Sequence, residues 1–184
     1  MVPEFQKIDG AKRDVLPLGR YLASFEDLKE RYVPEGDKNR QEIWDAFQDV
    51  LGQLRTILNS VAAVWIGGSF ITSEAEPHDI DVVFIITEDT YNAATSNIAK
   101  FALWVLSDNT SVPPRLNPLV DGYLLVVPPT EVVLNDVTRT EYARQRGYWD
   151  QFWSKTRFLD ASDDRWHYPA AGYVEVIVDG YDIH

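Results

Sequence analysis

The sequence contains no cysteine, which excludes disulfide scaffolds, zinc–thiolate centres and cysteine-based catalysis. It also lacks a long apolar run, and no stretch approaches the roughly 20 residues that a transmembrane helix needs. The first residues, MVPEFQKIDGAKRD, include no apolar segment of the kind found in a secretory signal. These absences are compatible with the reducing cytoplasm, and we expect a cytoplasmic protein with no membrane partner.

Positive charge is also scarce. Lys and Arg total 17 against 29 Asp and Glu, so the formal net charge is −12. A field of this sign repels nucleic-acid backbones unless basic residues cluster locally, and the sequence has no broad basic tract. The composition therefore argues against a long nucleic acid as partner and favours a protein or a small cationic molecule.

Core-forming side chains are plentiful for a chain of this length. The 184 residues suit one compact domain, and 6 Trp, 9 Tyr and 8 Phe supply apolar surface that a disordered chain lacks. Two prolines and two glycines punctuate the first 20 residues. We therefore expect an irregular N-terminal arm over 1–20 and a single domain over 21–184.

The hydrophobic pattern predicts an alternation of helices and strands. Apolar residues at helical spacing predict four helices, each behind a capping residue. These are 25–32 behind Ser24, about 39–58 behind Asp37, about 91–106 behind Asp89 or Thr90, and about 139–153 behind Asp136 or Thr138. Apolar runs predict strands at 62–66, 79–86, 119–127 and 173–178, the last at an edge, with a loop over 107–118. This order indicates an α/β or α+β domain; the lack of a Gly-rich βαβ fingerprint argues against a Rossmann fold.

A glycine turn and an acidic pair are the residues that suggest chemistry. One predicted strand ends in Gly67, Gly68 and Ser69, and the next opens with Asp79 and Asp81, beginning ten residues after Ser69. Residues i and i+2 of a strand point to the same side, so both carboxylates aim at one spot near the glycine turn.

Two carboxylates this close repel each other, and a divalent metal compensates them well. Hard oxygen ligands select Mg²⁺ or Mn²⁺, which share their coordination with substrate phosphates. Gly67 and Gly68 let the backbone approach a phosphate, while Ser69 adds a hydroxyl donor and can open a short helix. A phosphate cradle beside metal-binding carboxylates is the arrangement that nucleotidyl transfer requires.

These motifs resemble the signature of the polymerase-beta-like nucleotidyltransferase superfamily, here Ile66-Gly67-Gly68-Ser69 and Asp79-Ile80-Asp81. A closer similarity is to short nucleotidyltransferase-like proteins of bacteria and phages, through Leu16-Pro17-Leu18-Gly19, the turn from Gly68 to Thr72 and the strand from Pro77 to Asp81. The similarity covers residues 16 to 127, approximately. It implies a small mixed β-sheet of the nucleotidyltransferase type, flanked by helices.

The resemblance also implies a third carboxylate on a later strand. Asp121 opens the strand predicted at 119–127 and stands in a suitable place to join Asp79 and Asp81. In the superfamily this acid is a metal ligand or the base for the attacking hydroxyl. Taken singly, these residues also have ordinary structural interpretations, such as a tight turn for the glycines, a helix cap for Ser69 and a solvated strand end for each acid.

Two functions remain open from the sequence. The first is an enzyme that moves a nucleoside monophosphate from a nucleoside triphosphate, ATP by default, to a hydroxyl of a protein or small molecule, with Mg²⁺ or Mn²⁺ as cofactor. The second is a catalytically silent binding module on the same fold, such as a regulatory or toxin–antitoxin partner. Placement of the Asp79, Asp81 and Asp121 carboxylates within metal-sharing distance would favour the enzyme, whereas a displaced Asp121 would favour the module.

Overall fold

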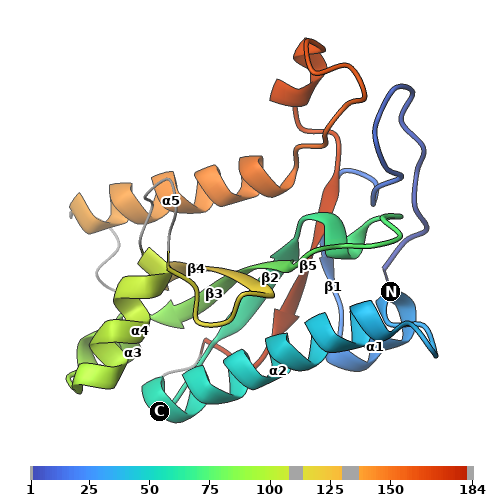
Figure 1. Ribbon diagram of the computed structural model, residues 1–184. Coiled ribbons are helices and arrows are strands. Elements are labelled where there is room, and N and C mark those ends of the chain that lie inside the picture. The colour runs from blue at the N-terminus through green and yellow to red at the C-terminus, as the bar shows by residue number, and fades with distance from the viewer. Residues whose placement is uncertain (1, 108–113, 130–136, 182–184) are drawn as a thin grey trace.

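A five-stranded mixed sheet forms the centre of the fold, as Figure 1 shows. The computed structural model describes residues 2–107, 114–129 and 137–181, apart from the side chains of 137–140. The strand order is β1-β5-β2-β3-β4. The strands are β1 (Gly19–Leu22), β2 (Ala63–Gly67), β3 (Ile80–Thr87), β4 (Val120–Val127) and β5 (Gly172–Ile177). The α/β class predicted from the sequence, with a mixed sheet flanked by helices, is confirmed.

Two parallel pairs are joined through β2. β1 runs parallel to β5 and β3 runs parallel to β4, while β2 is antiparallel to both β5 and β3. Parallel neighbours need a crossover, and α3 (Glu88–Ala93) and α4 (Asn97–Ser107) lie in the chain between β3 and β4. The register sets Asp81 beside Asp121 at the start of these two strands.

Helices cover both faces of the sheet (Figure 1). α1 (Phe25–Tyr32) and α2 (Lys38–Leu58) lie on one side, and α5 (Val137–Trp153) crosses the other. Side chains on the α2 side include Ile66 and Phe84, which are fully buried. β3 reads as a nearly continuous apolar run because both of its faces are covered. Among the described helices, none combines the length and apolar character needed to cross a membrane.

Capping side chains start the first two helices where the sequence predicted. The Ser24 hydroxyl accepts a hydrogen bond from the Asp27 backbone, and the Asp27 carboxylate accepts one from the Ser24 backbone, so α1 begins with a complete capping box. The Asp37 carboxylate likewise accepts from the backbone N–H of Arg40 at the start of α2.

The single helix predicted over 91–106 is wrong, because this stretch belongs to two helices. Thr87 caps α3, whose last residue is Ala93, and the Ser96 hydroxyl then accepts from the backbone of Ala99 at the start of α4. Hydroxyl side chains compete with the helical backbone for hydrogen bonds, and Ser96 therefore begins a new helix instead of continuing the old one.

Two predictions about the outer strands are also corrected. β5 is not an edge strand, because β1 pairs with its outer side. β1 begins inside the arm predicted to be irregular, and Val15 and Leu16 of that arm are buried. A four-residue strand paired with a segment about 150 residues away carries no local periodicity, so the pattern could not reveal it. Asp136 and part of the predicted 107–118 loop lie outside the described residues; Thr138 falls inside α5.

Arg40 of α2 is a charged residue whose side chain is buried. The guanidinium donates to the carbonyls of Tyr32 (3.1 Å), Phe70 (2.7 Å) and Thr72 (3.4 Å), and also to that of Glu74. It thereby ties α1 and α2 to the segment that follows the glycine turn. A buried guanidinium is tolerated here because backbone acceptors satisfy it.

We predict that Arg40→Met lowers the free energy of unfolding by about 3 kcal/mol, since several buried carbonyls lose their donor. Urea denaturation measures the change. The matched control is Arg55→Met, which removes an arginine whose side chain is 52% exposed and which pairs with Asp179. The control should cost less than about 1 kcal/mol. Equal losses of unfolding free energy in the two variants would contradict the conclusion that Arg40 ties α1 and α2 to the segment after the glycine turn.

Candidate functional site

Three acidic residues meet where β3 and β4 begin. Asp79 immediately precedes β3, and Asp81 and Asp121 are register partners on the paired strands. Neighbouring strands lie about 4.8 Å apart, so these last two side chains leave the same face of the sheet side by side. The structure thus brings Asp121 to the other two acids instead of placing it elsewhere.

An arginine links the acids on this face. Arg115 Nη1 donates to Asp79 Oδ2 at 2.8 Å, and its Nη2 lies 3.0 Å from Asp121 Oδ2. Burial opposes the charge of Arg115, but the hydrogen bond to Asp79 and the charge of Asp121 outweigh it and raise the arginine pKa. The guanidinium is therefore a permanent positive charge set between two of the three carboxylates.

The pKa of Asp81 is strongly raised by its surroundings. Burial, together with the charges of Asp79 and Asp121, raises the pKa of Asp81 to about 7. The positive charges of Arg115 and Arg157 oppose this rise without cancelling it. Close to neutral pH the Asp81 carboxyl thus changes between its neutral and ionised forms, which reflects first its burial and then the like charges beside it.

Tyr123 and two tryptophans of α5 form an aromatic wall beside the acids. The Tyr123 hydroxyl donates to Asp121 Oδ2 at 3.0 Å, and its ring centroid lies 4.5 Å from that of Trp149 and 6.0 Å from that of Trp153. Burial, and after it the charge and hydrogen bond of Asp121, raises the pKa of Tyr123. The phenol therefore stays protonated and orients the Asp121 carboxylate.

The glycine turn fits closely against this cluster. A Cβ atom on Gly67 would lie 2.7 Å from the Trp153 ring, and one on Gly68 would lie 1.6 Å from Asp81 Oδ2. Gly68 also has φ +70°, a conformation that side chains other than glycine rarely adopt. The bare backbone at these positions is therefore required by the packing of the site itself.

Ser69 opens a short 3₁₀ helix (η1, Ser69–Ile71), in agreement with the sequence-based expectation of a short helix there. Its carbonyl accepts from both the backbone and the side chain of Thr72. A single turn has little macrodipole, so the contribution of Ser69 is limited to its partly exposed hydroxyl and local backbone groups.

The cluster has the donor chemistry of a Mg²⁺ or Mn²⁺ site, but its present geometry is that of an ion pair. Within the part of the chain that the structure describes, no group of three His, Cys, Asp or Glu side chains is placed to hold a metal ion. Arg115 stands between Asp79 and Asp121. A metal ion bound by these two carboxylates would have to replace the guanidinium.

Sequence reasoning missed Arg115 and Tyr123. Arg115 lies in the turn-rich segment before β4, six residues ahead of Asp121, and a lone cation so close to a predicted acidic strand end is the signal that points to it. Tyr123 is two residues after Asp121 and so leaves the same face of the strand, which the period of two predicts.

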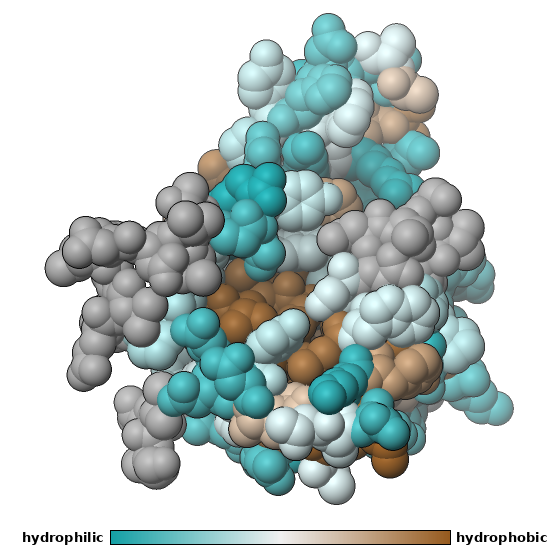
Figure 2. Space-filling model, turned by 90° about the vertical axis from the view of Figure 1, so that its left-hand side faces the viewer, coloured by the Kyte–Doolittle hydropathy of each residue, from teal (hydrophilic) through white to brown (hydrophobic). Residues whose placement is uncertain are grey.

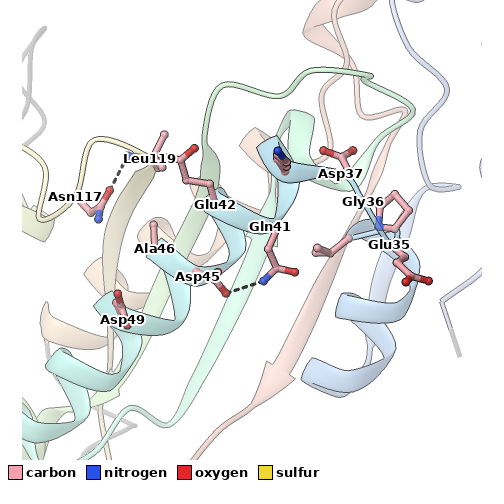
Figure 3. A pocket seen from close by; sticks show the side chains of 13 residues that line it. Glu35, Gly36, Asp37, Gln41, Glu42, Asp45, Ala46, Asp49, Asn117 and Leu119 are labelled. Atoms are coloured by element: carbon pink, nitrogen blue, oxygen red, sulfur yellow. Dashed lines mark hydrogen bonds between the residues drawn. The ribbon is translucent and has the colours of Figure 1, made fainter.

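Two hollows lie near the acids without being lined by them. Figure 3 shows a groove of about 650 Å³ between the first half of α2 and the turn at Asn117 and Leu119. Its charged lining is mostly acidic: Glu35, Asp37, Glu42, Asp45 and Asp49 face a single Lys38. Negative charge therefore gathers on the side of the molecule where the chain turns into β4.

The second hollow is lined by apolar and aromatic side chains together with polar and charged ones such as Glu88, Glu141 and Arg144. It has a volume of about 770 Å³ and lies among α3, α4, β4 and α5, with Leu124, Val126, Tyr148 and Trp149 in its lining. Figure 2 looks at this end of the molecule, where hydrophobic side chains gather in a depression. Trp149 also belongs to the aromatic wall, so this hollow and the acids share one structural element.

A family model matches residues 8–177, and the chain belongs to that family, DUF6932, described as a family of unknown function. No curated protein and no solved structure matches the chain. The family's description names no activity, so the function has to be argued from the geometry of the acids, the arginine and the glycine turn.

Gly68→Ala should destabilise the protein, because its Cβ would overlap the Asp81 carboxylate and its φ is unfavourable for alanine. We expect a loss of about 1–3 kcal/mol in the free energy of unfolding. Gly52→Ala is the control, since Gly52 lies inside α2 and nothing surrounds its Cβ position. That variant should gain about 0.5–1 kcal/mol. Chemical denaturation compares them, and a neutral Gly68→Ala would mean that the turn is not packed as described.

Asp81→Asn should change the pH dependence of stability. The pKa of Asp81 is about 7 in the folded state against 3.8 for the free side chain, so the folded protein keeps a proton that the unfolded chain loses. Wild-type stability therefore falls as pH rises from about 4 to 7, and the variant escapes this loss. Urea titrations should find Asp81→Asn more stable by about 1–3 kcal/mol at pH 8, with the gain shrinking toward pH 4.

The control for this experiment is Asp49→Asn, at an exposed position on α2. Its difference in stability from wild type should be small, because the side chain is exposed. A pH-independent effect of Asp81→Asn would show that burial and the neighbouring carboxylates do not raise the pKa of Asp81.

Proposed function

We propose that this member of the family is a metal-dependent nucleotidyltransferase of the cytoplasm, which moves a nucleoside monophosphate from a nucleoside triphosphate, ATP by default, to a hydroxyl acceptor. The observation that carries the proposal is the pairing of Asp81 with Asp121 on adjacent strands, with Gly68 packed against the Asp81 carboxylate. Carboxylates gathered beside a bare backbone turn would hold a divalent metal ion, whose positive charge suits the negative charge on a transferring phosphoryl group.

The glycine turn would hold the phosphates. Gly67 and Gly68 carry no side chain of their own, but Trp153 and the Asp81 carboxylate lie where their Cβ atoms would be. A phosphate would therefore approach the exposed backbone of Gly68, next to the Ser69 hydroxyl, which is a further donor. Here the chain's own contribution is positioning, because a triphosphate fixed in one orientation presents its α-phosphorus to a single direction of attack.

The acids would organise the reacting centre. Asp79, Asp81 and Asp121 would hold Mg²⁺ or Mn²⁺, which supplies positive charge for the α-phosphate and the leaving pyrophosphate. The acceptor hydroxyl oxygen bonds to the α-phosphorus as the bond from that phosphorus to the bridging oxygen breaks, and pyrophosphate leaves. Asp121 accepts the hydroxyl proton or serves as a metal ligand, and Tyr123 orients its carboxylate in either role.

The charge of the molecule restricts the acceptor. A net charge of −12, with acids concentrated along the groove beside α2, repels a polyanion and attracts a cation. We propose a protein or a small cationic molecule as the acceptor, in preference to a long RNA.

A second function, a catalytically silent binding module on this fold, is favoured by one observation. Arg115 pairs with both Asp79 and Asp121, so these two carboxylates have a counter-charge without a metal. A module of this kind would bind a nucleotide or a protein partner, such as a toxin, and carry out no transfer.

Calorimetric titration tests the nucleotide site. We expect ATP to bind at least tenfold more tightly with Mg²⁺ than without it, because Mg²⁺ shares ligands between carboxylates and phosphates. Asp81→Asn should lose this metal-dependent gain, whereas Asp49→Asn should retain it. Gly68→Ala should weaken ATP binding by more than its loss of stability accounts for. Equal ATP affinity with and without Mg²⁺ would remove the support for a metal-dependent enzyme.

Labelling tests the acceptor. The protein is incubated with ATP radiolabelled at the α-phosphate and a cell lysate, and the products are digested separately with RNase and protease. We expect the label on protein or small molecules, since the negative field excludes polyanions. A label removed by RNase and untouched by protease would overturn the electrostatic argument. Absence of transfer under every metal condition would favour the silent module.

A further inference from the structure

We infer that Arg115 is a resident cation that competes with a divalent metal for Asp79 and Asp121, so that these carboxylates take up metal only when the guanidinium withdraws. The inference rests on the proposed function, because it concerns how the metal of that site would be admitted.

The contacts of Arg115 identify the competition. Its two terminal nitrogens lie 2.8 Å from Oδ2 of Asp79 and 3.0 Å from Oδ2 of Asp121. A cation shared by these two residues would bind the same two carboxylates, one just before β3 and the other in β4. A guanidinium bound to two carboxylates and a metal bound to the same oxygens exclude each other. Because arginine does not lose its proton, only movement of the side chain can free the site.

The surroundings of Arg115 allow that movement. Its side chain is 32% exposed, and its remaining hydrogen bond goes to the carbonyl of Pro118 in its own turn, at 3.1 Å. The turn is anchored separately, since Leu116 packs on the core and the Asn117 side chain accepts from the backbone of Leu119. The guanidinium can therefore swing into solvent while the backbone that leads into β4 stays in place.

The charges around the cluster favour a cation after Arg115 leaves. Asp79, Asp81 and Asp121 are faced by Arg115 in direct contact and by Arg157 at longer range, whose charge acts on Asp81. Without Arg115 the three acids have a single, more distant counter-charge among the described residues that act on Asp81. Such a cluster attracts Mg²⁺ or Mn²⁺ more strongly than the bridged cluster does.

Binding of Mn²⁺ alone tests the inference. The signal of free Mn²⁺ in electron paramagnetic resonance is followed during titration of wild type, Arg115→Gln and the control Arg144→Gln. Arg144 pairs with Glu141 on α5 and touches none of the three acids. We expect Arg115→Gln to bind Mn²⁺ at least tenfold more tightly than wild type, and Arg144→Gln to match wild type. Adding Asp121→Asn to Arg115→Gln should abolish most of the gain.

Equal or weaker Mn²⁺ binding by Arg115→Gln overturns the inference, as does a gain that survives Asp121→Asn. If circular dichroism shows that Arg115→Gln is unfolded, Arg115→Lys is titrated instead. The ammonium of lysine is one compact nitrogen without the two separately placed terminal nitrogens of a guanidinium, so it should hold the two carboxylates less firmly. This variant should therefore still exceed wild type, and failure to do so overturns the inference.

The two proposals fail separately. The Mn²⁺ titration contains no nucleotide, so a gain in Arg115→Gln with no ATP binding by wild type leaves the inference standing and removes the nucleotidyltransferase. Metal-dependent ATP binding with no gain in Arg115→Gln has the opposite meaning.

Discussion

The parallel register of β3 and β4 places two aspartates side by side at one corner of the sheet, with a third directly before β3. Like charges at this distance would ordinarily be separated by a shift of the chain, but a one-residue slip of β3 would misfit side chains that are packed against both layers of helices. β3 is buried on both faces, so the register cannot relax. The raised pKa of Asp81, the bridging arginine and the close fit of Gly68 all follow from this constraint.

Two arginines stabilise the region in different ways. Arg40 is buried and donates to backbone carbonyls, so its loss would leave acceptors without donors in a closed space. Arg115 is partly exposed and pairs with acids at the surface of the cluster. Its side chain is 32% exposed, so water can reach its contacts. The first residue therefore holds the segment after the glycine turn in place, and the second is suited to exchange.

The same geometry separates the enzyme from the silent module. If the acids keep Arg115 as their partner, the protein is expected to be a binding domain. If they exchange Arg115 for a metal ion, it is expected to be a transferase. Asp121 is not displaced, since it lies beside Asp81 on the paired strand, but Arg115 stands between Asp79 and Asp121 and the three carboxylates are not placed to share a metal ion. The description of the family names no activity, so the choice between enzyme and binding module depends on the chemistry of Asp79, Asp81, Asp121 and Arg115.

Local interactions are what the sequence by itself determined. The capping box at Ser24 and the cap at Asp37 act within one helical turn, and the apolar run after Asp79 specifies a buried strand from neighbouring residues alone. The proximity of Asp79 and Asp81 to the glycine turn was likewise readable, because two strands joined by a short connection pair readily. The spacing of these motifs supported a site before any fold was known.

Tertiary structure decided the rest, because the deciding contacts join residues far apart in the chain. The pairing of β1 with β5, the burial of Arg40 under four carbonyls and the position of Arg115 between two acids have no local period to reveal them. Asp121 could be suspected from the sequence, but only the register of a parallel pair, set by packing on both faces of the sheet, brought it beside Asp81.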